Sequence, residues 1–549
     1  MRHRSDLFFL ILLSSYNKVF NSAVALCSDP YNESADVTCN RPTPEAFNAG
    51  RKLFFNFEES RALGADVDLS EREMKANQII MSVKHKEYEE GLVVPHLFAP
   101  SQHIFKVLKK IRSSPLFEYL SMMPKGAVLH AHDTALCSTK FLIKLTYRSK
   151  LWVCQAEGEL KVSAFRFSNQ KPDAYIKDVQ CDWMLMQDLR TIHGAQQVDQ
   201  YLRDWFSLYP RKKYLDNNEV WKNFSGIFRL LGGLLYYAPV WADYYYNALS
   251  EFYIDGVQYL EFRTTLPRLY DLQSNAHTEL YTVQIYKETL DKFMANNPGF
   301  IGSKFIYAPP RRVDNARLDN YIMLAIELKK KYPDFFAGFD LVGQEELGRP
   351  LKDFIPQLLS MPENIDFYFH AGETNWYGSS VDENLIDAIL LGTKRIGHGF
   401  SLLKHPLVLD MIKERNIAIE VNPISNQVLL LVSDYRNHPC AHFFSDNYPV
   451  VISSDDPSFW KATPLSHDFY IAFLGIASAH ADIRLLKKLA TNSIEYSSLN
   501  ASQKVDALNA WQLKWNDFID LVVERNAAPA DHPTHRLGGY MDNKIDSES

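Results

Sequence analysis

The sequence predicts an α/β protein whose main domain is a (β/α)8 TIM barrel, with a helical region before it and an insertion after the first barrel strand. Eight short apolar runs of strand character recur along the chain, and most of them are separated by helical stretches. The gap between residues 132 and 257 is much longer than the others, so it must contain an insertion. The number of runs also fits a doubly wound parallel sheet, and this second architecture stays open.

The composition excludes several other classes of protein. The chain has 549 residues, of which 46% are hydrophobic and 23% are charged, and its formal net charge is −7. These proportions exclude a disordered chain, a collagen, a coiled coil and a small disulfide-rich scaffold. With 59 Lys and Arg against 66 Asp and Glu, the chain has no excess of positive charge to attract nucleic acid. Its length suits one large domain with one or two smaller regions.

The N-terminus has the pattern of a secretory signal peptide. Arg2 and Arg4 precede an apolar run over residues 7–13, and Ala23-Val24-Ala25 forms a small-residue cleavage motif. The alternative interpretation is an apolar helix of the core. The run is too short to span a bilayer, which takes about 20 residues, and no later stretch reaches that length. We therefore expect residues 1–25 to be removed, the protein to be secreted and extracellular, and no membrane span to be present.

The cysteines and glycosylation sequons are compatible with a secretory route. The six cysteines are Cys27, Cys39, Cys137, Cys154, Cys181 and Cys440, and no two of them form a C-x-x-C motif. Their spacing alone does not decide which of them pair. Sequons for N-glycosylation begin at Asn32, Asn223 and Asn500, and a sequon is used only where it is exposed.

Residues 26–122 are predicted to form a helical region. Apolar residues recur at helical spacing from about residue 41 to residue 120. Ser70 and Glu73 form a capping box, which predicts the start of a helix, and Gly91 supplies a stop signal for the same helix.

The barrel domain is predicted over residues 123–526. Its strands are expected at residues 126–132, 257–265, 303–308, 335–342, 366–371, 395–400, 417–422 and 449–454. Within the long gap, Cys154 and Cys181 bracket a polar segment with few helix signals. We therefore expect a disulfide-closed excursion inside an insertion over about residues 145–190. Residues 527–549 are rich in Pro, Gly, His and Asp and are predicted to be a disordered tail.

Several predicted strands end in residues that suit a metal ion and proton transfer. In chain order these are His130 and His132, His370 and Glu373, His398, and Asp455 and Asp456. Residues two apart on a strand face the same way, and catalytic groups of a barrel lie at the C-terminal ends of its strands. Each residue alone also has a structural interpretation, such as a hydrogen-bonded core histidine or a helix-capping acid. Their joint occurrence at one end of one barrel favours a functional site.

The residue types predict a catalytic zinc centre. Imidazole nitrogen and carboxylate oxygen are the ligands that a catalytic zinc accepts, with one position left for water. We predict one Zn²⁺ per chain, held by His130, His132, His370 and Asp455. Glu373 can then carry a proton, His398 can orient or deprotonate the attacking water, and Asp456 can hold a polar edge of the substrate. This chemistry is hydrolytic attack on an electrophilic carbon.

Seven motifs resemble those of the adenosine deaminase superfamily, and specifically its secreted branch, the adenosine deaminase growth factors. They are MPKGAVLHAHD (123–133), VWKNF (220–224), AGFDLVG (337–343), FHAGET (369–374), TKRIGHGF (393–400), NPISNQVL (422–429) and SSDDP (453–457). The motifs occur in the order that the family has, across nearly the whole predicted mature chain. The other zinc-dependent nucleobase deaminases are excluded, because their P-C-x-x-C motif is missing.

The resemblance implies hydrolytic deamination of adenosine and 2'-deoxyadenosine to inosine and deoxyinosine, with release of ammonia. It implies the same four zinc ligands, with Glu373 protonating the purine N1 and His398 acting on the water. The implied substrate-binding residues are Asp456 at N7, the backbone of Gly343 at N3, and Asp133 and Trp221 at the ribose or the pocket wall. It further implies a homodimer formed through the N-terminal helices, and an insertion that contacts a cell-surface receptor or glycan.

One position departs from the family pattern. Pro310 stands where related proteins carry a histidine near the ribose, and proline offers no donor, so we expect weaker ribose binding. Two other functions stay open at this point. The first is a secreted growth-factor-like ligand with a weakly active or inactive zinc barrel. The second is a hydrolase for another amine or for a nucleotide, whose phosphate would need Arg311 and Arg312.

Overall fold

The computed structural model describes residues 43–155, 160–173, 175–176, 179–209, 216–273 and 275–527. The predicted signal peptide, Cys27, Cys39 and all but the first residue of the predicted tail lie outside these residues. Within the described part of the chain, none of the helices is both long and apolar enough to cross a lipid bilayer.

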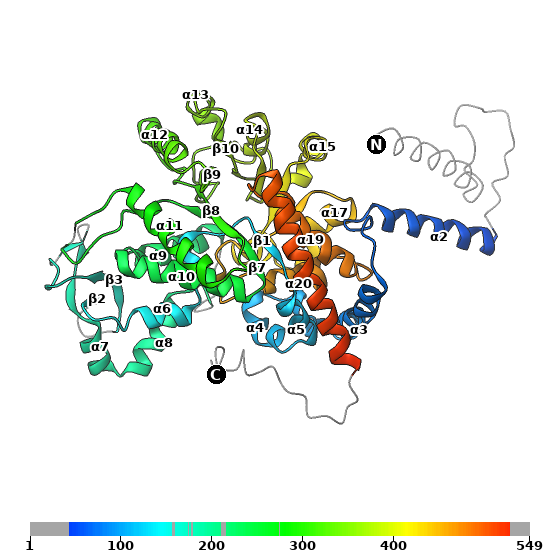
Figure 1. The fold of residues 1–549 in the computed structure, drawn as a ribbon, viewed down its shortest axis with the longest axis horizontal. Helices are drawn as coiled ribbons and strands as arrows, with labels where there is room; N and C mark the ends of the chain where they lie inside the picture. Colours follow the sequence, from blue (N-terminus) through cyan, green and yellow to red (C-terminus); the bar gives the residue numbers. More distant parts are fainter. Residues whose placement is uncertain are drawn as a thin grey trace.

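A parallel barrel forms the centre of the molecule (Figure 1). One arc of the barrel contains β1 (Gly126–Val128), β7 (Val257–Thr264), β8 (Gly302–Tyr307), β9 (Phe336–Phe339) and β10 (Asp366–Phe367). The other arc contains β11 (His370–Ala371), β12 (Arg395–His398), β13 (Ala418–Val421) and β14 (Val450–Ile452). The two arcs are joined where the N–H of Asp455 donates to the carbonyl of His130 and the N–H of His132 donates to the carbonyl of Asp455. The barrel that the sequence predicts is confirmed.

The fifth predicted strand, 366–371, is divided into β10 and β11. The break falls at Tyr368 and Phe369, and the carbonyl of Tyr368 accepts a hydrogen bond from Nη2 of the buried Arg263. At the break, the carbonyl of Tyr368 is therefore hydrogen-bonded to a side chain. The other seven predicted runs each contain one strand, although most strands are shorter than the runs.

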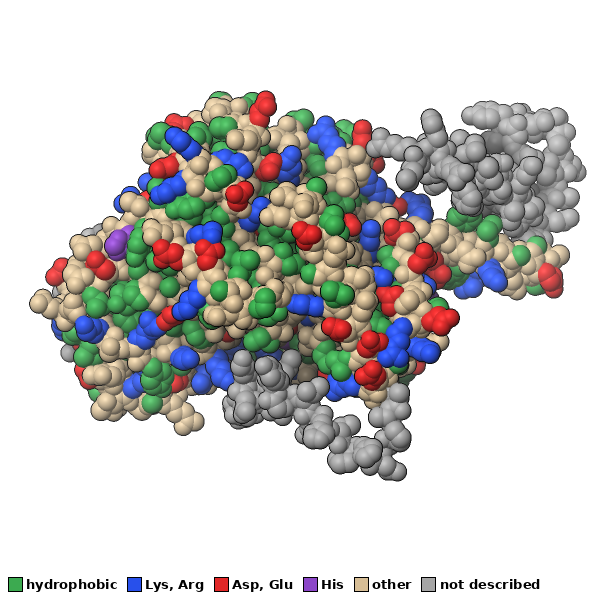
Figure 2. Space-filling view, in the orientation of Figure 1, with side chains coloured by type: hydrophobic (Ala, Val, Ile, Leu, Met, Phe, Trp, Pro, Cys, Tyr) green, Lys and Arg blue, Asp and Glu red, His purple; other side chains and the backbone are tan. Residues whose placement is uncertain are grey.

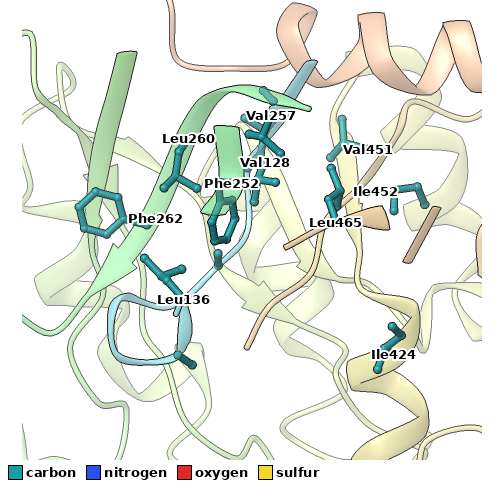
Figure 3. Packing of buried hydrophobic residues seen from close by; sticks show 14 of the residues in the cluster. Val128, Leu136, Phe252, Val257, Leu260, Phe262, Ile424, Val451, Ile452 and Leu465 are labelled. Atoms are coloured by element: carbon teal, nitrogen blue, oxygen red, sulfur yellow. The ribbon is translucent and has the colours of Figure 1, made fainter. Parts of the chain in front are cut away.

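The barrel strands are buried on both faces, which explains why they appear as apolar runs in the sequence. All eight residues of β7 are buried. Around the strands, Val128, Val257, Leu260, Val451 and Ile452 belong to one continuous hydrophobic core (Figure 3). The helices of the barrel domain are α10 (Ala238–Ile254), α11 (Glu279–Asn296), α12 (Asn315–Lys331), α13 (Ile355–Leu359), α14 (Asn384–Leu390), α15 (Pro406–Arg415), α16 (Pro423–Val428), α17 (Cys440–Ser445), α18 (Ser466–Tyr470) and α19 (Ile483–Glu495).

The N-terminal region is helical, as expected. It contains α2 (Pro44–Arg61), α3 (Glu71–Val93), α4 (Ile104–Arg112) and α5 (Pro115–Met122). The capping box of Ser70 and Glu73 is present at the start of α3. The prediction that Gly91 stops this helix is wrong, because α3 continues to Val93. Gly91 instead allows close packing, since a Cβ atom there would lie 2.6 Å from the ring of Phe98.

The last helix of the chain, α20 (Ala501–Ala527), packs against α3. Nε1 of Trp515 donates to Oε1 of Glu73 at 2.7 Å, and Nζ of Lys487 donates to the same oxygen at 2.7 Å. The helix α2 extends away from this assembly and has no buried residues (Figure 1).

The insertion after β1 contains a small antiparallel sheet. Its strands are β2 (Leu151–Gln155), β3 (Val162–Phe167) and β6 (Asp182–Leu185), with β4 (Tyr175–Ile176) and β5 (Val179–Gln180) as a separate pair. The predicted Cys154–Cys181 disulfide is present, with a Cα–Cα distance of 5.2 Å. The helices α6 (Thr139–Leu145), α7 (Met186–His193), α8 (Ala195–Trp205) and α9 (Asn217–Leu235) flank the sheet. Cys137 and Cys440 are buried free thiols.

Acidic and basic side chains are interspersed over the visible surface (Figure 2). This distribution agrees with the small net charge of −7.

Candidate active site

The C-terminal ends of the barrel strands bring together a group of side chains that we call the mouth cluster. Its members are His130, His132, His370, Glu373, His398, Asp455 and Asp456. The ring centroid of His130 lies 4.5 Å from that of His370 and 4.8 Å from that of His398. The structure thus brings together every residue that the sequence selected as a candidate for metal binding or proton transfer.

Unusual backbone conformations turn several of these side chains toward the mouth. His398 has a φ of 63° and Asp455 a φ of 58°, both in the left-handed region that non-glycine residues rarely occupy. Gly397 precedes His398, and a Cβ atom there would lie only 3.1 Å from Cε1 of His130. Gly372 has a φ of 74°, a conformation that favours glycine and turns the chain just before Glu373.

Three imidazoles are arranged to accept a metal ion. One ring nitrogen from each of His130, His132 and His370 lies within 4.8 Å of the others. Nδ1 of His130 lies 2.8 Å from Oε2 of Glu420, and Nδ1 of His370 lies 2.6 Å from Oδ2 of Asp340. Nε2 of His130 is buried and has no hydrogen-bond partner among the described residues, which is costly unless a ligand binds it. This donor set fits zinc, whose histidine ligands are held by carboxylates in this way.

Asp455 supplies a carboxylate beside these rings. Its Oδ1 lies 3.1 Å from Nε2 of His132 and 3.7 Å from Nε2 of His130. Burial acts to raise the pKa of Asp455, but the hydrogen bond and charge of His132 outweigh burial and lower the pKa below its ordinary value. An ionised carboxylate at this position is suited to a metal ion.

Behind the histidines lies a set of buried ion pairs that we call the charge layer. Its members are Glu261, Arg263, Asp340, Arg395 and Glu420, all at most 1% exposed. Arg263 donates to Asp340 at 2.8 Å and to Glu420 at 2.7 Å. Arg395 donates to Glu420 at 2.5 Å and to Glu261 at 2.7 Å. The charge layer therefore fixes the two carboxylates that contact His130 and His370.

Two acids of the mouth cluster have raised pKa values. Burial raises the pKa of Glu373 well above its usual range, and the charge of Asp455 raises it further. Burial and the same charge raise the pKa of Asp456, whose Oδ1 has no hydrogen-bond partner within the described chain. The N–H of Glu373 donates to Oε1 of Glu345 at 3.2 Å, which helps to fix the turn that presents Glu373. Glu373 and Asp456 can thus act as hydrogen-bond or proton donors.

The predicted substrate-binding residues lie on separate elements of the chain. Asp133 follows β1 and accepts a hydrogen bond from the hydroxyl of Tyr286 at 3.0 Å. Trp221 lies on α9, half-buried, with its ring centroid 5.2 Å from that of Phe224. Gly343 has a φ of 109°, a conformation that favours glycine.

Pro310 is exposed next to this segment and bridges Val342. The neighbouring hydrogen bonds are made by the carbonyl of Pro309 and the N–H of Arg311, so the strand edge needs no donor at position 310. Arg311 is only 1% exposed and donates to the carbonyls of Leu341 and His370. The Arg311 side chain is therefore buried in the barrel wall and is not available to bind a phosphate at the surface.

Sequence reasoning missed the residues that support the cluster from behind. Asp340 lies in AGFDLVG, and Glu420 lies in the buried run of β13. Asn426 contacts Nδ1 of His398, and His438 contacts Asn426. For Asp340 and Glu420 the available signal was a charged residue inside a predicted, otherwise apolar strand, which identifies no partner by itself. Asn426 and His438 lie outside the strands and gave no such signal.

Comparisons with known proteins decide the family. A model of the adenosine deaminase family matches residues 204–511, and a model of the adenosine/AMP deaminase N-terminal region matches residues 8–120. The chain belongs to the adenosine deaminase family. This confirms the resemblance inferred from the motifs.

Known members of the family align with this chain over most of their own length. Adenosine deaminase of Lutzomyia longipalpis is 51% identical over 480 residues, which cover 87% of this chain and 94% of the relative. Adenosine deaminase 2 of Homo sapiens is 41% identical over 471 residues, which cover 84% of this chain and 91% of the human protein. The crystal structure of Arabidopsis ADAL complexed with GMP superposes with a TM-score of 0.51 at 17% identity, covering 72% of this chain and 98% of that one. This last likeness shows a shared fold.

Proposed function

We propose that this protein is a zinc-dependent adenosine deaminase that converts adenosine and 2'-deoxyadenosine to inosine and deoxyinosine with release of ammonia. The observation that carries the proposal is a three-histidine cluster with a free, buried ring nitrogen beside two acids whose pKa values are raised. Such a site combines a place for a metal ion with groups that protonate a purine ring. The names of the relatives support the choice of substrate.

The zinc ion is assigned to four of the clustered side chains. They are His130, His132, His370 and Asp455. When bound, zinc supplies a Lewis acid that lowers the pKa of water and so provides a nucleophile at neutral pH. The charge layer holds the rings of His130 and His370 through Nδ1, so that both present Nε2 to the mouth.

The remaining groups act on the substrate. Glu373, protonated in its buried position, donates its proton to N1 of the purine, which makes C6 more electrophilic. Asp456, also protonated, donates a hydrogen bond from its carboxyl group to N7. Water adds to C6, ammonia leaves, and inosine remains. His398 acts on the attacking water.

The ribose and the outer parts of the base are assigned to the rim of the mouth. Asp133 accepts hydrogen bonds from ribose hydroxyls, and Trp221 forms part of the pocket wall. The backbone of Gly343 contacts N3. Pro310 leaves one ribose contact to water, which weakens binding by an estimated 0.5 to 1.5 kcal/mol, about the value of one hydrogen bond.

The protein is further proposed to be a secreted homodimer. The signal-peptide pattern of residues 1–25 supports secretion. The N-terminal helices support dimerisation, because α2 buries none of its residues and Leu92 and Val93 of α3 are 67% and 81% exposed. Light scattering of the full chain tests the dimer.

The deaminase proposal is tested by metal analysis and an absorbance assay for conversion of adenosine to inosine. We expect about one zinc per chain, loss of activity on chelation and its return when zinc is restored. A protein that holds zinc fully yet shows no deamination at millimolar adenosine would contradict the proposal and favour a ligand without enzymatic activity.

A further inference from the structure

His398 contacts the mouth cluster with one ring nitrogen and the protein interior with the other. Its Nε2 lies 3.5 Å from Oε1 of Glu373 and 3.7 Å from Oδ2 of Asp455. Its Nδ1 lies 3.2 Å from Nδ2 of Asn426. A neutral imidazole carries its proton on only one nitrogen, so the partner at Nδ1 decides whether Nε2 is a donor or an acceptor.

A buried chain of hydrogen bonds leads from Cys440 through His438 and Asn426 to His398. The donor and acceptor of each bond follow when the chain is read from Cys440. The N–H of Cys440 lies 3.0 Å from Nδ1 of His438. Because Cys440 is the first residue of α17, its N–H has no acceptor within the helix and needs one outside it. A backbone N–H can only donate, so Nδ1 of His438 carries no proton. Burial lowers the pKa of His438 to about 3, which keeps the ring neutral.

Each following contact is fixed by the previous one. A neutral His438 without a proton on Nδ1 carries it on Nε2, which lies 2.8 Å from Oδ1 of Asn426. The amide oxygen of Asn426 therefore faces His438, and its NH2 group faces His398. Nδ1 of His398 accepts this hydrogen bond, so the proton of a neutral His398 is on Nε2. Asn426 is fully buried and His438 is 3% exposed, so water does not compete for these contacts.

We propose that His438 and Asn426 are positioning residues that hold His398 with its Nε2 protonated, so that His398 presents a hydrogen-bond donor to the reacting centre. The meaning of this arrangement for catalysis rests on the proposed deaminase function, whereas the arrangement itself does not.

The tautomer separates the two roles that the sequence left open for His398. A protonated Nε2 orients the oxygen of the attacking water by donating to it, but cannot remove a proton from it. Once Glu373 has given its proton to N1, it is an ionised carboxylate whose Oε1 lies 3.5 Å from Nε2 of His398. In this form it can accept the proton of the water. The same carboxyl group thus gives one proton to N1 and receives another from the water. It then passes this proton to the 6-amino group, which leaves as ammonia, and takes up the proton of the C6 hydroxyl, which leaves the carbonyl of inosine and restores the protonated Glu373.

The tautomer can be observed by ¹⁵N NMR of the zinc-loaded protein labelled at its histidines. The signals of His398 are identified by their absence from His398→Gln. We expect an unprotonated Nδ1 and a protonated Nε2. A protonated Nδ1 in the wild-type protein overturns the inference, whether or not the protein deaminates adenosine. The expected tautomer in a protein without deaminase activity contradicts only the proposed function.

Two substitutions at position 438 form a matched pair. His438→Gln keeps an N–H group near the place of Nε2, so the tautomer of His398 should be kept. His438→Asn keeps an acceptor for the N–H of Cys440 but removes the donor to Asn426, so His398 should become a mixture of tautomers. We expect kcat to fall about 10-fold in His438→Asn, the value of one hydrogen bond, with little change in KM.

Asn426→Asp provides an independent test if a variant at position 438 fails to fold. Its carboxylate can only accept, so the proton of His398 should move to Nδ1. A wild-type tautomer in folded His438→Asn or Asn426→Asp would overturn the inference.

Discussion

The charge layer and the mouth cluster are joined through His130 and His370, yet they differ in whether their buried polar atoms have hydrogen-bond partners. In the charge layer, each carboxylate oxygen of Glu261, Asp340 and Glu420 accepts at least one hydrogen bond. In the mouth cluster, polar atoms of His130 and Asp456 have no partner in the described chain. Paired charges fix the positions of side chains, whereas unpaired groups are ready to bind a ligand.

The largest effect is expected from removing a metal ligand of the mouth cluster. His370→Ala should abolish zinc binding and activity, because one of the three clustered imidazoles is lost. Elemental analysis and the adenosine assay measure both. Wild-type zinc content in this variant would contradict the assignment of His370 as a ligand.

The next largest effect is expected at Glu373. Glu373→Gln keeps the shape and removes the proton carrier, so kcat should fall by about 10² to 10⁴ while zinc content stays unchanged. Steady-state kinetics and metal analysis check this. A turnover within about tenfold of wild type would show that another group protonates the purine.

A substitution in the charge layer should instead act on stability and on the metal together. Glu420→Gln weakens the pairing of Arg263 and Arg395 and the contact with His130, so we expect zinc affinity to fall about 10- to 100-fold. Removing one partner of a buried ion pair typically costs about 3 to 5 kcal/mol of unfolding free energy. Chemical denaturation and zinc titration measure the two effects. The exposed Glu414→Gln is the matched control and should change neither.

A smaller effect is expected at the rim of the mouth. Pro310→His restores a hydrogen-bond donor where the strand edge requires none, so KM for adenosine should fall several-fold with a smaller change in kcat. Steady-state kinetics decide the outcome. An unchanged KM would place the ribose away from residue 310.

The smallest effect is expected in the pH dependence of stability. In the metal-free protein the pKa of folded Glu373 is raised above the unfolded value of about 4.3. Between these values Glu373 keeps a proton in the folded state that it has lost in the unfolded state, so its own contribution to the unfolding free energy falls as pH rises above about 4. This contribution is missing from Glu373→Gln, so the unfolding free energy of the wild type relative to the variant should fall as pH rises. Equal slopes for the variant and the wild type would mean that Glu373 is ionised in the folded protein.

The barrel strands and the mouth cluster could be predicted because each leaves a local signal. A strand buried on both faces is apolar along its whole length, and its end carries the functional side chain. The strands of the insertion were not predicted, because they lie in a polar segment and neither β3 nor β6 has a strict alternation of exposed and buried residues. Local spacing did not distinguish them from a loop.

The charge layer could not be predicted for a different reason. Glu420 meets His130, 290 positions earlier in the chain, and Arg395 meets Glu261, 134 positions earlier. These pairs exist only once the barrel has closed, so no window of sequence contains both members. Gly91 shows the same limit, because its role depends on the approach of Phe98 and not on helix termination.

The contact between Trp515 and Glu73 has a consequence for the synthesis of the chain. The two residues are 442 positions apart, and ribosomes add about 5 to 20 residues per second. After Glu73 has been made, roughly 20 to 90 seconds therefore pass before its indole partner exists. During this time α3 has no C-terminal helix to pack against. Docking of α20 against α3 is thus a late event of folding.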